Sequence, residues 1–442
     1  MEIIKNQKIN INSLVKVLFY AFPVVFIVSS GAVNAHLVLF IIFSLILIKK
    51  NNLTTNINLP NLLPFIFFAC LALSTFMQYQ ELNFNNILKS IFLIRFAFLI
   101  FVIKILTTNK IIDLKKFFLV SLFCTGFASF DNIFQYIFGY DVLGIEIRDK
   151  RISGIFGEEA ISGGYIRLLS LFSIFYIYIF FKNKKLKYFL LFLIILLHGI
   201  GIFVSSNRMP MFLFLFSSML ILIFVKNFRI VTSCALIAFI TIAFNLLNND
   251  QYLQYRYEGF SSKIKHEVQI NKENEKASQN ENKKQVVPKK NFFDYSHGQI
   301  YLTAIETWKE KPLLGNGVKS FRTKCKKFQG KSKRSNLTPT GKIYYKCSTH
   351  PHNYYLEILN DGGLIGITLM LIYFLTLLRS FYYYLKINFF KDHSEIYVVM
   401  PIIITFLVTI WPIQSTGGVL STWTGTFFWL VVALANTVEL KK

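Results

Sequence analysis

The sequence predicts an all-α, polytopic integral membrane protein with about twelve transmembrane helices and a large extracytoplasmic loop before the third-last helix. Composition is the first observation, because 54% of the 442 residues are hydrophobic and only 16% are charged. Second, the apolar residues form long continuous runs, and a run of roughly 18 or more crosses a bilayer as a helix. Third, basic residues collect in alternate connections between the runs, as they do in multi-pass membrane proteins.

The apolar runs fall into two groups on either side of the large loop. Nine runs precede the loop, near residues 14–28, 33–48, 62–77, 87–106, 117–138, 164–181, 188–204, 209–225 and 230–247. Three runs follow it, near residues 355–385, 397–411 and 422–434. The first run follows two lysines and resembles a secretory signal, but with so many further runs behind it we expect a retained helix. The chain therefore divides into helices one to nine (1–247), the loop (248–354) and helices ten to twelve (355–442).

The formal net charge of +25 would suit nucleic-acid binding, but the placement of the cations argues against it. Basic pairs and triplets occupy every second connection and the C-terminus: Lys49, Lys50, Lys110, Lys115, Lys116, Lys182, Lys184, Lys185, Lys226, Arg229, Lys386, Lys391, Lys441 and Lys442. The connections near residues 78–81 and 412–418 contain no Lys or Arg. Because cytoplasmic loops are enriched in these residues, we expect both termini in the cytoplasm and no nucleic-acid partner.

The large loop is not uniform in composition. Residues 261–290 consist mainly of Lys, Glu, Asn and Gln and predict a flexible segment. Apolar residues at helical spacing predict an amphipathic helix over 299–310, which a turn at 312–317 would end. Cys325 and Cys347 lie in a loop where oxidising conditions permit a disulfide, and we expect them to pair. The bridge would close a loop of about twenty residues and contribute roughly 3 kcal/mol in a chain-entropy description.

Two arginines beside apolar runs are candidate anion ligands. Arg208 lies in a very short link between two apolar runs, where an arginine is costly unless it reaches the interface or has an anionic partner. A guanidinium can bind two phosphate oxygens at once, so we favour anion binding for Arg208. Arg151 precedes glycines and carboxylates at the start of a helix. Phosphate binding and interfacial anchoring are equally good interpretations of Arg151.

Histidines before the third-last helix are the candidate catalytic groups. His352 is the candidate general base, because a neutral imidazole can take a proton from a hydroxyl group. His350, Asn353 and His297 are candidate substrate contacts, although a capping or surface role is the more ordinary interpretation of His297. His350 and His352 could hold a metal ion together with Cys347. The expected disulfide removes that thiolate and no acidic ligand is adjacent, so we expect no metal and no cofactor.

These residues bring out a resemblance to a known family. His352-Asn353, nine further residues and then Gly363-Leu364-Ile365-Gly366 resemble the H-[NSQ]-x9-G-x-x-G signature of bacterial O-antigen ligases. Pro312, Gly315 and Gly317 are similar to the P-x-x-G-x-G turn of the same membrane domain. The domain is shared with O-antigen polymerases, and the helix arrangement with its large loop resembles the family over most of the chain.

The resemblance implies a metal-independent, inverting glycosyltransferase in the bacterial inner membrane. It would transfer a glycan from undecaprenyl pyrophosphate to the lipid A core on the periplasmic side, in contact with membrane lipid. His352 would deprotonate the acceptor hydroxyl. Arg208, and in second place Arg151, would bind the departing pyrophosphate, whose developing charge preorganised arginines stabilise well.

The sequence departs from the family pattern at one position. Family members often carry an arginine near the start of the loop's amphipathic helix, and His297 stands there instead. Either His297 takes part of that role, or Arg256 or Arg322 supplies the charge. Two other functions stay open. One is a polymerase that joins repeat units on the same lipid carrier, and the other is a non-enzymatic transporter of lipid-linked sugars.

Overall fold

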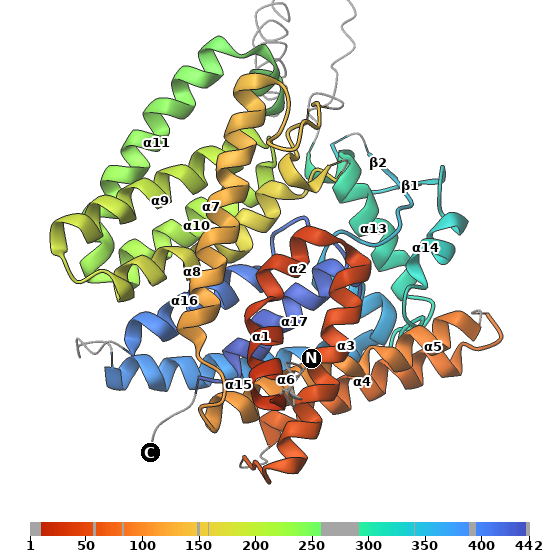
Figure 1. Cartoon of the computed structure of the whole chain (residues 1–442). Coiled ribbons are helices and arrows are strands. Elements are labelled where there is room, and N and C mark those ends of the chain that lie inside the picture. The colour runs from red at the N-terminus through yellow and green to blue at the C-terminus, as the bar shows by residue number, and fades with distance from the viewer. Residues whose placement is uncertain are drawn as a thin grey trace, which may run out of the picture.

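The computed structural model (Figure 1) describes residues 10–55, 59–81, 84–147, 151–157, 159–257, 291–339, 341–388 and 395–438. The expected flexible segment 261–290 lies outside these residues. The described part of the chain is mostly helical. It also contains a two-stranded antiparallel hairpin that was not predicted, formed by β1 (Ser332–Arg334) and β2 (Lys342–Tyr344).

Every predicted apolar run is helical in the structure. Before the large loop the helices are α1 (Ile11–Tyr20), α2 (Phe22–Val28), α3 (Ser30–Lys50), α4 (Leu59–Met77), α5 (Phe84–Phe92), α6 (Ile94–Thr108), α7 (Leu114–Phe138), α8 (Ser162–Phe180), α9 (Lys184–Val204), α10 (Arg208–Phe224) and α11 (Arg229–Asn249). After it come α15 (Tyr354–Asn388), α16 (Ile396–Thr409) and α17 (Trp423–Ala435). Short 3₁₀ turns, η1 (Gly154–Phe156) and η2 (Lys226–Phe228), complete the connections.

Fewer helices are long enough to span the membrane than the twelve apolar runs predict. Eight helices are long and apolar enough to cross a bilayer, and α1 with α2, bent by 58°, would make a ninth. Three further apolar helices, α10, α16 and α17, are shorter. A chain with this many apolar helices is an integral membrane protein. The count of twelve spans stays a prediction, because three of the twelve runs form helices below the usual spanning length.

The α7–α8–α9 region shows how closely the helices pack. Gly201 of α9 faces α7 so tightly that an added Cβ would lie 2.8 Å from Cα of Ser129. Small residues allow this approach, which is the usual way in which membrane helices associate. His198 of α9 fills the space beside this contact and is fully buried between α7 and α8.

Residues 291–353, which we call the loop module, gather at one side of the helices (Figure 1). The module contains η3 (Phe292–Asp294), α13 (Ser296–Trp308), α14 (Phe321–Lys324), η4 (Cys325–Lys327) and the β1–β2 hairpin. Its apolar side chains form two small clusters apart from the main core, one around Ile300 and Phe321 and one around Leu302 and Ile343. The predicted helix over 299–310 corresponds to α13. A disulfide joins Cys325 to Cys347, with the two Cα atoms 5.1 Å apart.

The glycine motifs of the sequence meet where the loop module docks on α15. Gly363 interrupts α15 with φ +63° and ψ −161°, a conformation that favours glycine. The backbone of residues 312–317 fills the gap, because the amide of Leu364 donates to the Pro312 carbonyl over 2.9 Å and that of Gly317 donates to the Asp361 carbonyl over 3.1 Å. A Cβ on Gly315 would lie 2.5 Å from the Gly363 nitrogen. The two motifs therefore form one backbone-to-backbone junction.

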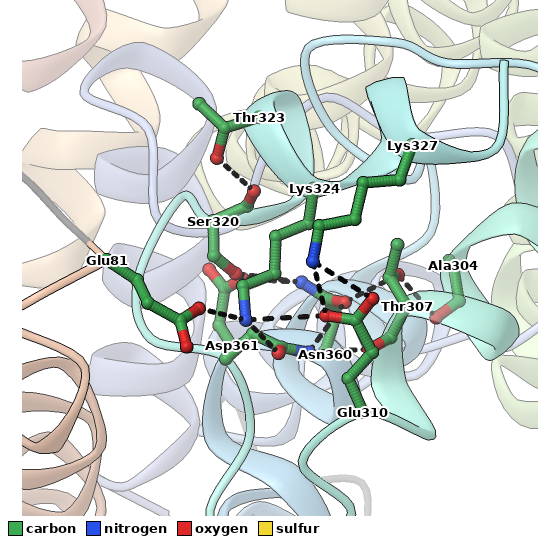
Figure 2. A network of polar contacts seen from close by, with 11 residues as sticks. Glu81, Ala304, Thr307, Glu310, Ser320, Thr323, Lys324, Lys327, Asn360 and Asp361 are labelled. Carbon is green, nitrogen blue, oxygen red and sulfur yellow. Dashed lines mark hydrogen bonds and ion pairs between the residues drawn. The ribbon is translucent and has the colours of Figure 1, made fainter.

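A network of polar contacts holds this junction to the rest of the molecule (Figure 2). Lys324 Nζ lies 2.9 Å from a carboxylate oxygen of Glu81 and 3.5 Å from one of Glu310, and it donates to Asn316 Oδ1 over 2.7 Å. Asn360 of α15 donates to Ser320 Oγ over 3.1 Å. The turn between residues 315 and 324 is thus fixed to α15 and to the end of α4.

Candidate functional site

His352 lies two residues before α15, in a strained backbone conformation. Its φ is +56°, which costs an L-residue roughly 1–2 kcal/mol. Two hydrogen bonds to its carbonyl hold it there, one from the amide of Thr416 at 2.9 Å and one from the hydroxyl of Tyr301 at 3.3 Å. Strain of this kind is found where the surroundings impose a geometry that a site requires.

Three histidines converge at this point. The ring centroid of His352 lies 4.1 Å from that of His350 and 5.2 Å from that of His297. The closeness of His350 and His352 was predictable, because one residue separates them in the sequence. The structure adds His297, which lies in the first turn of α13 and is distant from His352 in the sequence. Ser348 Oγ lies 3.1 Å from Nε2 of His352, so the catalytic candidate is already in contact with a hydroxyl group.

All three imidazoles favour the neutral form. Partial burial, followed by the nearby His350 and His297, lowers the pKa of His352 from 6.5 to about 4. Burial also lowers the pKa of His350, with a smaller contribution from the charge of Arg322. The pKa of His297 is lowered by desolvation and then by the charge of Lys346. A base that is neutral at physiological pH can accept a proton there.

A cavity of about 240 Å³ is lined by Tyr354, two residues after His352. It lies between the first turns of α8, α10 and α15 and the segment 414–417, and we call it cavity 1. Its polar lining includes Asn207, Gln414 and Thr416. Because the Thr416 amide donates to the His352 carbonyl, this lining is connected directly to the candidate base.

Arg208 begins α10 and is exposed next to cavity 1, whose lining includes its neighbours Asn207 and Met209. Arg256 lies close enough for the two positive charges to repel each other, and it donates to the carbonyl of Ser206 over 3.1 Å. Of the residues considered for the missing charge, Arg256 therefore lies beside Arg208, and its role there stays a prediction. Arg151 is exposed on the connection between α7 and α8 and lines none of the cavities described here.

Arg167 of α8 is a functional candidate that the sequence reasoning missed. It lines cavity 1 opposite Tyr354, and its buried Nε has no hydrogen-bond partner among the described residues. A cation within an apolar helix is costly and is usually kept for function. The signal was present in the sequence, since Arg167 is the only charged residue in the run 164–181.

Asn353 and His350 have clear local contacts. Asn353 Oδ1 accepts hydrogen bonds from the amides of Tyr355 (3.0 Å) and Leu356 (3.2 Å), and its Nδ2 donates to the Pro412 carbonyl over 2.8 Å. It therefore caps α15 in the ordinary manner of asparagine, and contact with a substrate stays a prediction. His350 Nε2 lies 3.1 Å from the Thr416 carbonyl, which is consistent with a role in positioning the segment that contains His352.

Cys347 is joined to Cys325 in the disulfide and so is not a thiolate ligand for the histidines. In the described part of the chain there is no group of three or more His, Cys, Asp or Glu side chains placed to hold a metal ion. What the site does offer is a neutral base, hydroxyl groups and two arginines around a cavity. These are the groups needed for transfer chemistry on an anionic, hydroxyl-bearing substrate.

The fold and the site define the class of protein. It is a polytopic helical membrane protein with a group of histidines where the loop module meets α15. In a comparison with protein families, a family model described as O-Antigen ligase matches residues 190–371 of the chain. The match confirms the resemblance seen in the sequence, and it includes Arg208, His297 and His352. No curated protein matches the chain. The family match indicates an activity of the O-antigen ligase or polymerase kind, with lipid-linked glycans in a membrane as substrates.

Proposed function

We propose that this protein is an O-antigen ligase that transfers a glycan from undecaprenyl pyrophosphate to the lipid A core on the periplasmic face of the bacterial inner membrane. The observation that carries the proposal is His352, a neutral, half-buried imidazole in a strained backbone conformation. Its carbonyl accepts a hydrogen bond from Thr416, which lines cavity 1 together with Arg167. The family match supports the substrate class.

The chemistry is a direct displacement at the anomeric carbon. His352 takes the proton of the acceptor hydroxyl as that oxygen forms the new glycosidic bond. The bond between the anomeric carbon and the pyrophosphate oxygen breaks, and its electron pair leaves with undecaprenyl pyrophosphate. Arg208 and Arg167 neutralise the charge that develops on the leaving group, which is where fixed cations contribute most to rate. The configuration at the anomeric carbon is inverted, and no metal ion takes part.

Ser348 offers a competing mechanism, because its hydroxyl already contacts His352. A serine nucleophile activated by the histidine would form a glycosyl-enzyme and give retention after two displacements. Ser348→Ala separates the two mechanisms. With His352 as the base for the acceptor, transfer falls by no more than about fivefold, the value of one neutral hydrogen bond. With Ser348 as nucleophile, transfer is abolished.

The experiment that tests the proposed function is lipopolysaccharide gel profiling of a deletion strain complemented with variants. His352→Ala and Arg208→Ala are expected to leave the lipid A core uncapped while polymer accumulates on the carrier lipid. Arg229→Ala is the matched control, since among the described residues that guanidinium donates to the carbonyls of Leu222 and Ile223, within its own connection. It should restore the normal ladder.

The other outcomes of the same gel distinguish the alternatives. Loss of polymer that leaves single repeat units on the core would indicate a polymerase. A normal ladder from well-expressed His352→Ala would overturn the enzymatic role and favour a transporter, because transport needs no general base. Membrane abundance of each variant is measured by immunoblot, so that a missing ladder is not mistaken for a missing protein.

A further inference from the structure

Two cavities on the other side of the histidines share a basic wall. Cavity 2, of about 300 Å³, is lined by Lys89, Arg95 and Lys319. Cavity 3, of about 260 Å³, is lined by Lys319, Arg322 and His350. Lys319 lies in both linings, so the two cavities adjoin at its side chain. They bring together residues from α5, the start of α6 and the turn at 318–322.

These four cations differ from the other basic residues of the same region. Lys324 and Lys327 are paired with Glu81 and Glu310 (Figure 2). Lys89, Arg95, Lys319 and Arg322 form no ion pair with any residue that the structure describes, and the buried Nε of Arg95 has no hydrogen-bond partner there. Burial and then the charges of Arg322 and Lys89 lower the pKa of Lys319. The carboxyl groups of Glu357 and Asp361 act on Lys319, but the four cations outnumber them. Cations in excess and close together destabilise a fold unless an anion binds between them.

The surroundings of cavity 2 indicate that this anion is attached to a lipid. Phe92 of α5 and Val38 of α3 line cavity 2 and are 62% and 39% exposed. Both helices belong to candidate membrane spans, so these exposed apolar side chains are suited to contact lipid. A site that offers lysine and arginine next to lipid-facing aromatic and aliphatic groups matches a phosphorylated headgroup at the membrane interface. A free anion would gain nothing from the apolar rim.

Cavity 3 has the chemistry of a sugar site. Its lining contains the carboxylates of Glu357 and Asp361 and the hydroxyls of Thr349 and Ser421. Glu357 accepts a hydrogen bond from the Val419 amide over 2.7 Å, and Asp361 accepts one from the Lys319 amide over 2.8 Å. The carboxyl groups are thus held in place by the backbone. Asp361 also accepts a hydrogen bond from Asn360 Nδ2 over 3.1 Å, so Glu357 is the group with more remaining capacity to accept hydrogen bonds from hydroxyl groups.

Cavity 3 also connects to the catalytic candidates. His350 and Thr349 form part of its lining, and Gly417 and Thr424 line both cavity 3 and cavity 1. The two cavities are therefore separated by a thin wall that includes a glycine. A glycan extending through cavity 3 would approach His352 from the side that Arg208 does not occupy.

We propose that cavities 2 and 3 form the acceptor site: the phosphate of a membrane-anchored glycolipid binds among Lys89, Arg95 and Lys319, and its sugar extends through cavity 3 toward His352. This inference rests on the proposed transferase function. The donor pyrophosphate occupies cavity 1, and the acceptor arrives from the α3–α5 side. The polar network of Figure 2 holds the turn that presents Lys319 and Arg322.

The test is acceptor kinetics of the purified protein in nanodiscs with Lys89→Gln/Lys319→Gln. Loss of charge-assisted contacts should raise the KM for phosphorylated lipid A core at least about tenfold. The KM for the donor should stay within about twofold, because cavity 1 is untouched. The matched control is Lys326→Gln/Lys333→Gln, which removes two exposed charges from the loop module and should behave as wild type. Equal acceptor KM values for the three proteins would overturn the proposal.

A binding measurement separates failure of this site from failure of the transferase function. Native mass spectrometry of the detergent-purified protein counts bound phosphorylated lipid A core and does not depend on turnover. Wild type and His352→Ala should retain it, and Lys89→Gln/Lys319→Gln should lose it. Phosphatase-treated glycolipid should bind weakly to all of them. If inorganic phosphate competes as well as the glycolipid at equal concentration, the site binds a free anion and the assignment to a lipid is wrong.

Discussion

Two histidines of this protein, His198 and His352, have opposite environments. His198 lies between α7, α8 and α9 with no exposed surface. Both of its ring nitrogens have hydroxyl partners, Ser129 Oγ at 2.9 Å from Nδ1 and Ser173 Oγ at 3.0 Å from Nε2. Thr125 Oγ1 lies 3.3 Å from the same Nε2. The cluster is saturated with hydrogen bonds and joins three helices, which is what a structural polar group in a membrane bundle does.

The His352 cluster has the reverse properties. His352 is half-buried and has a left-handed backbone conformation, and its neighbours His350 and Tyr354 line cavities 3 and 1. Its neighbours are other histidines that disfavour its protonation. The comparison teaches that burial alone does not identify a functional histidine. Strain, incomplete packing and access to a cavity distinguish the group that reacts from the group that joins helices.

The largest expected effect is the loss of transfer in His352→Ala. Removing a general base typically lowers the rate by about 10²–10⁴, whereas the midpoint of thermal unfolding should stay near that of the wild type. Single-turnover transfer of labelled glycan in nanodiscs measures the rate. A loss of less than about tenfold would mean that His352 is not the general base, and the proposed difference in role between His352 and His198 would be wrong.

His198→Ala should show the opposite behaviour. The substitution leaves a cavity and three hydroxyl groups without their shared partner, which should lower the free energy of unfolding by about 2–4 kcal/mol. Transfer per folded molecule should be unchanged, because neither His198 nor its three hydroxyl partners line cavities 1 to 3. Denaturant titration in detergent micelles, with activity normalised to folded protein, measures both quantities. Loss of activity at full stability would mean that the bundle histidine also takes part in function.

The backbone strain at His352 gives a third contrast. Glycine adopts a positive φ without the penalty that alanine carries, so His352→Gly should be more stable than His352→Ala by about 1 kcal/mol. Both variants should be inactive. Comparing them with each other removes the contribution of the imidazole contacts. Equal unfolding midpoints would show that the conformation at this position relaxes when the histidine is absent.

Much of the fold was predictable because the membrane imposes a simple pattern. Each of the twelve apolar runs became a helix or a bent pair of helices, as expected where every backbone group must bond within its own segment. The β1–β2 hairpin was missed, since its strands are only three residues long and are exposed apart from Ile343. The break in α15 was also missed. Gly363 was noted only as part of a signature, and its positive φ depends on residues 312–317, which are distant in sequence.

The candidate site was only partly predictable, for a similar reason. His352, His350 and Arg208 stood out because short motifs place them beside apolar runs. Arg167 and Lys319 did not, because their significance comes from what surrounds them. Arg167 became a candidate through its unpartnered Nε and cavity 1. Lys319 did so through cations that lie far from it in sequence.

The pH dependence of transfer is the smallest effect and the sharpest test of the His352 environment. A general base works when deprotonated, and the pKa of His352 is lowered from 6.5 to about 4. Transfer should therefore be nearly constant from about pH 8 to pH 5.5 and fall to half near pH 4. Stability changes in the same direction. As pH falls below 6.5, the unfolded chain binds a proton at His352 before the folded chain does. The contribution of His352 to the free energy of unfolding is therefore complete above pH 6.5 and is lost as pH falls toward 4. A rate that halves near pH 6.5 would mean that the base titrates as an ordinary exposed histidine.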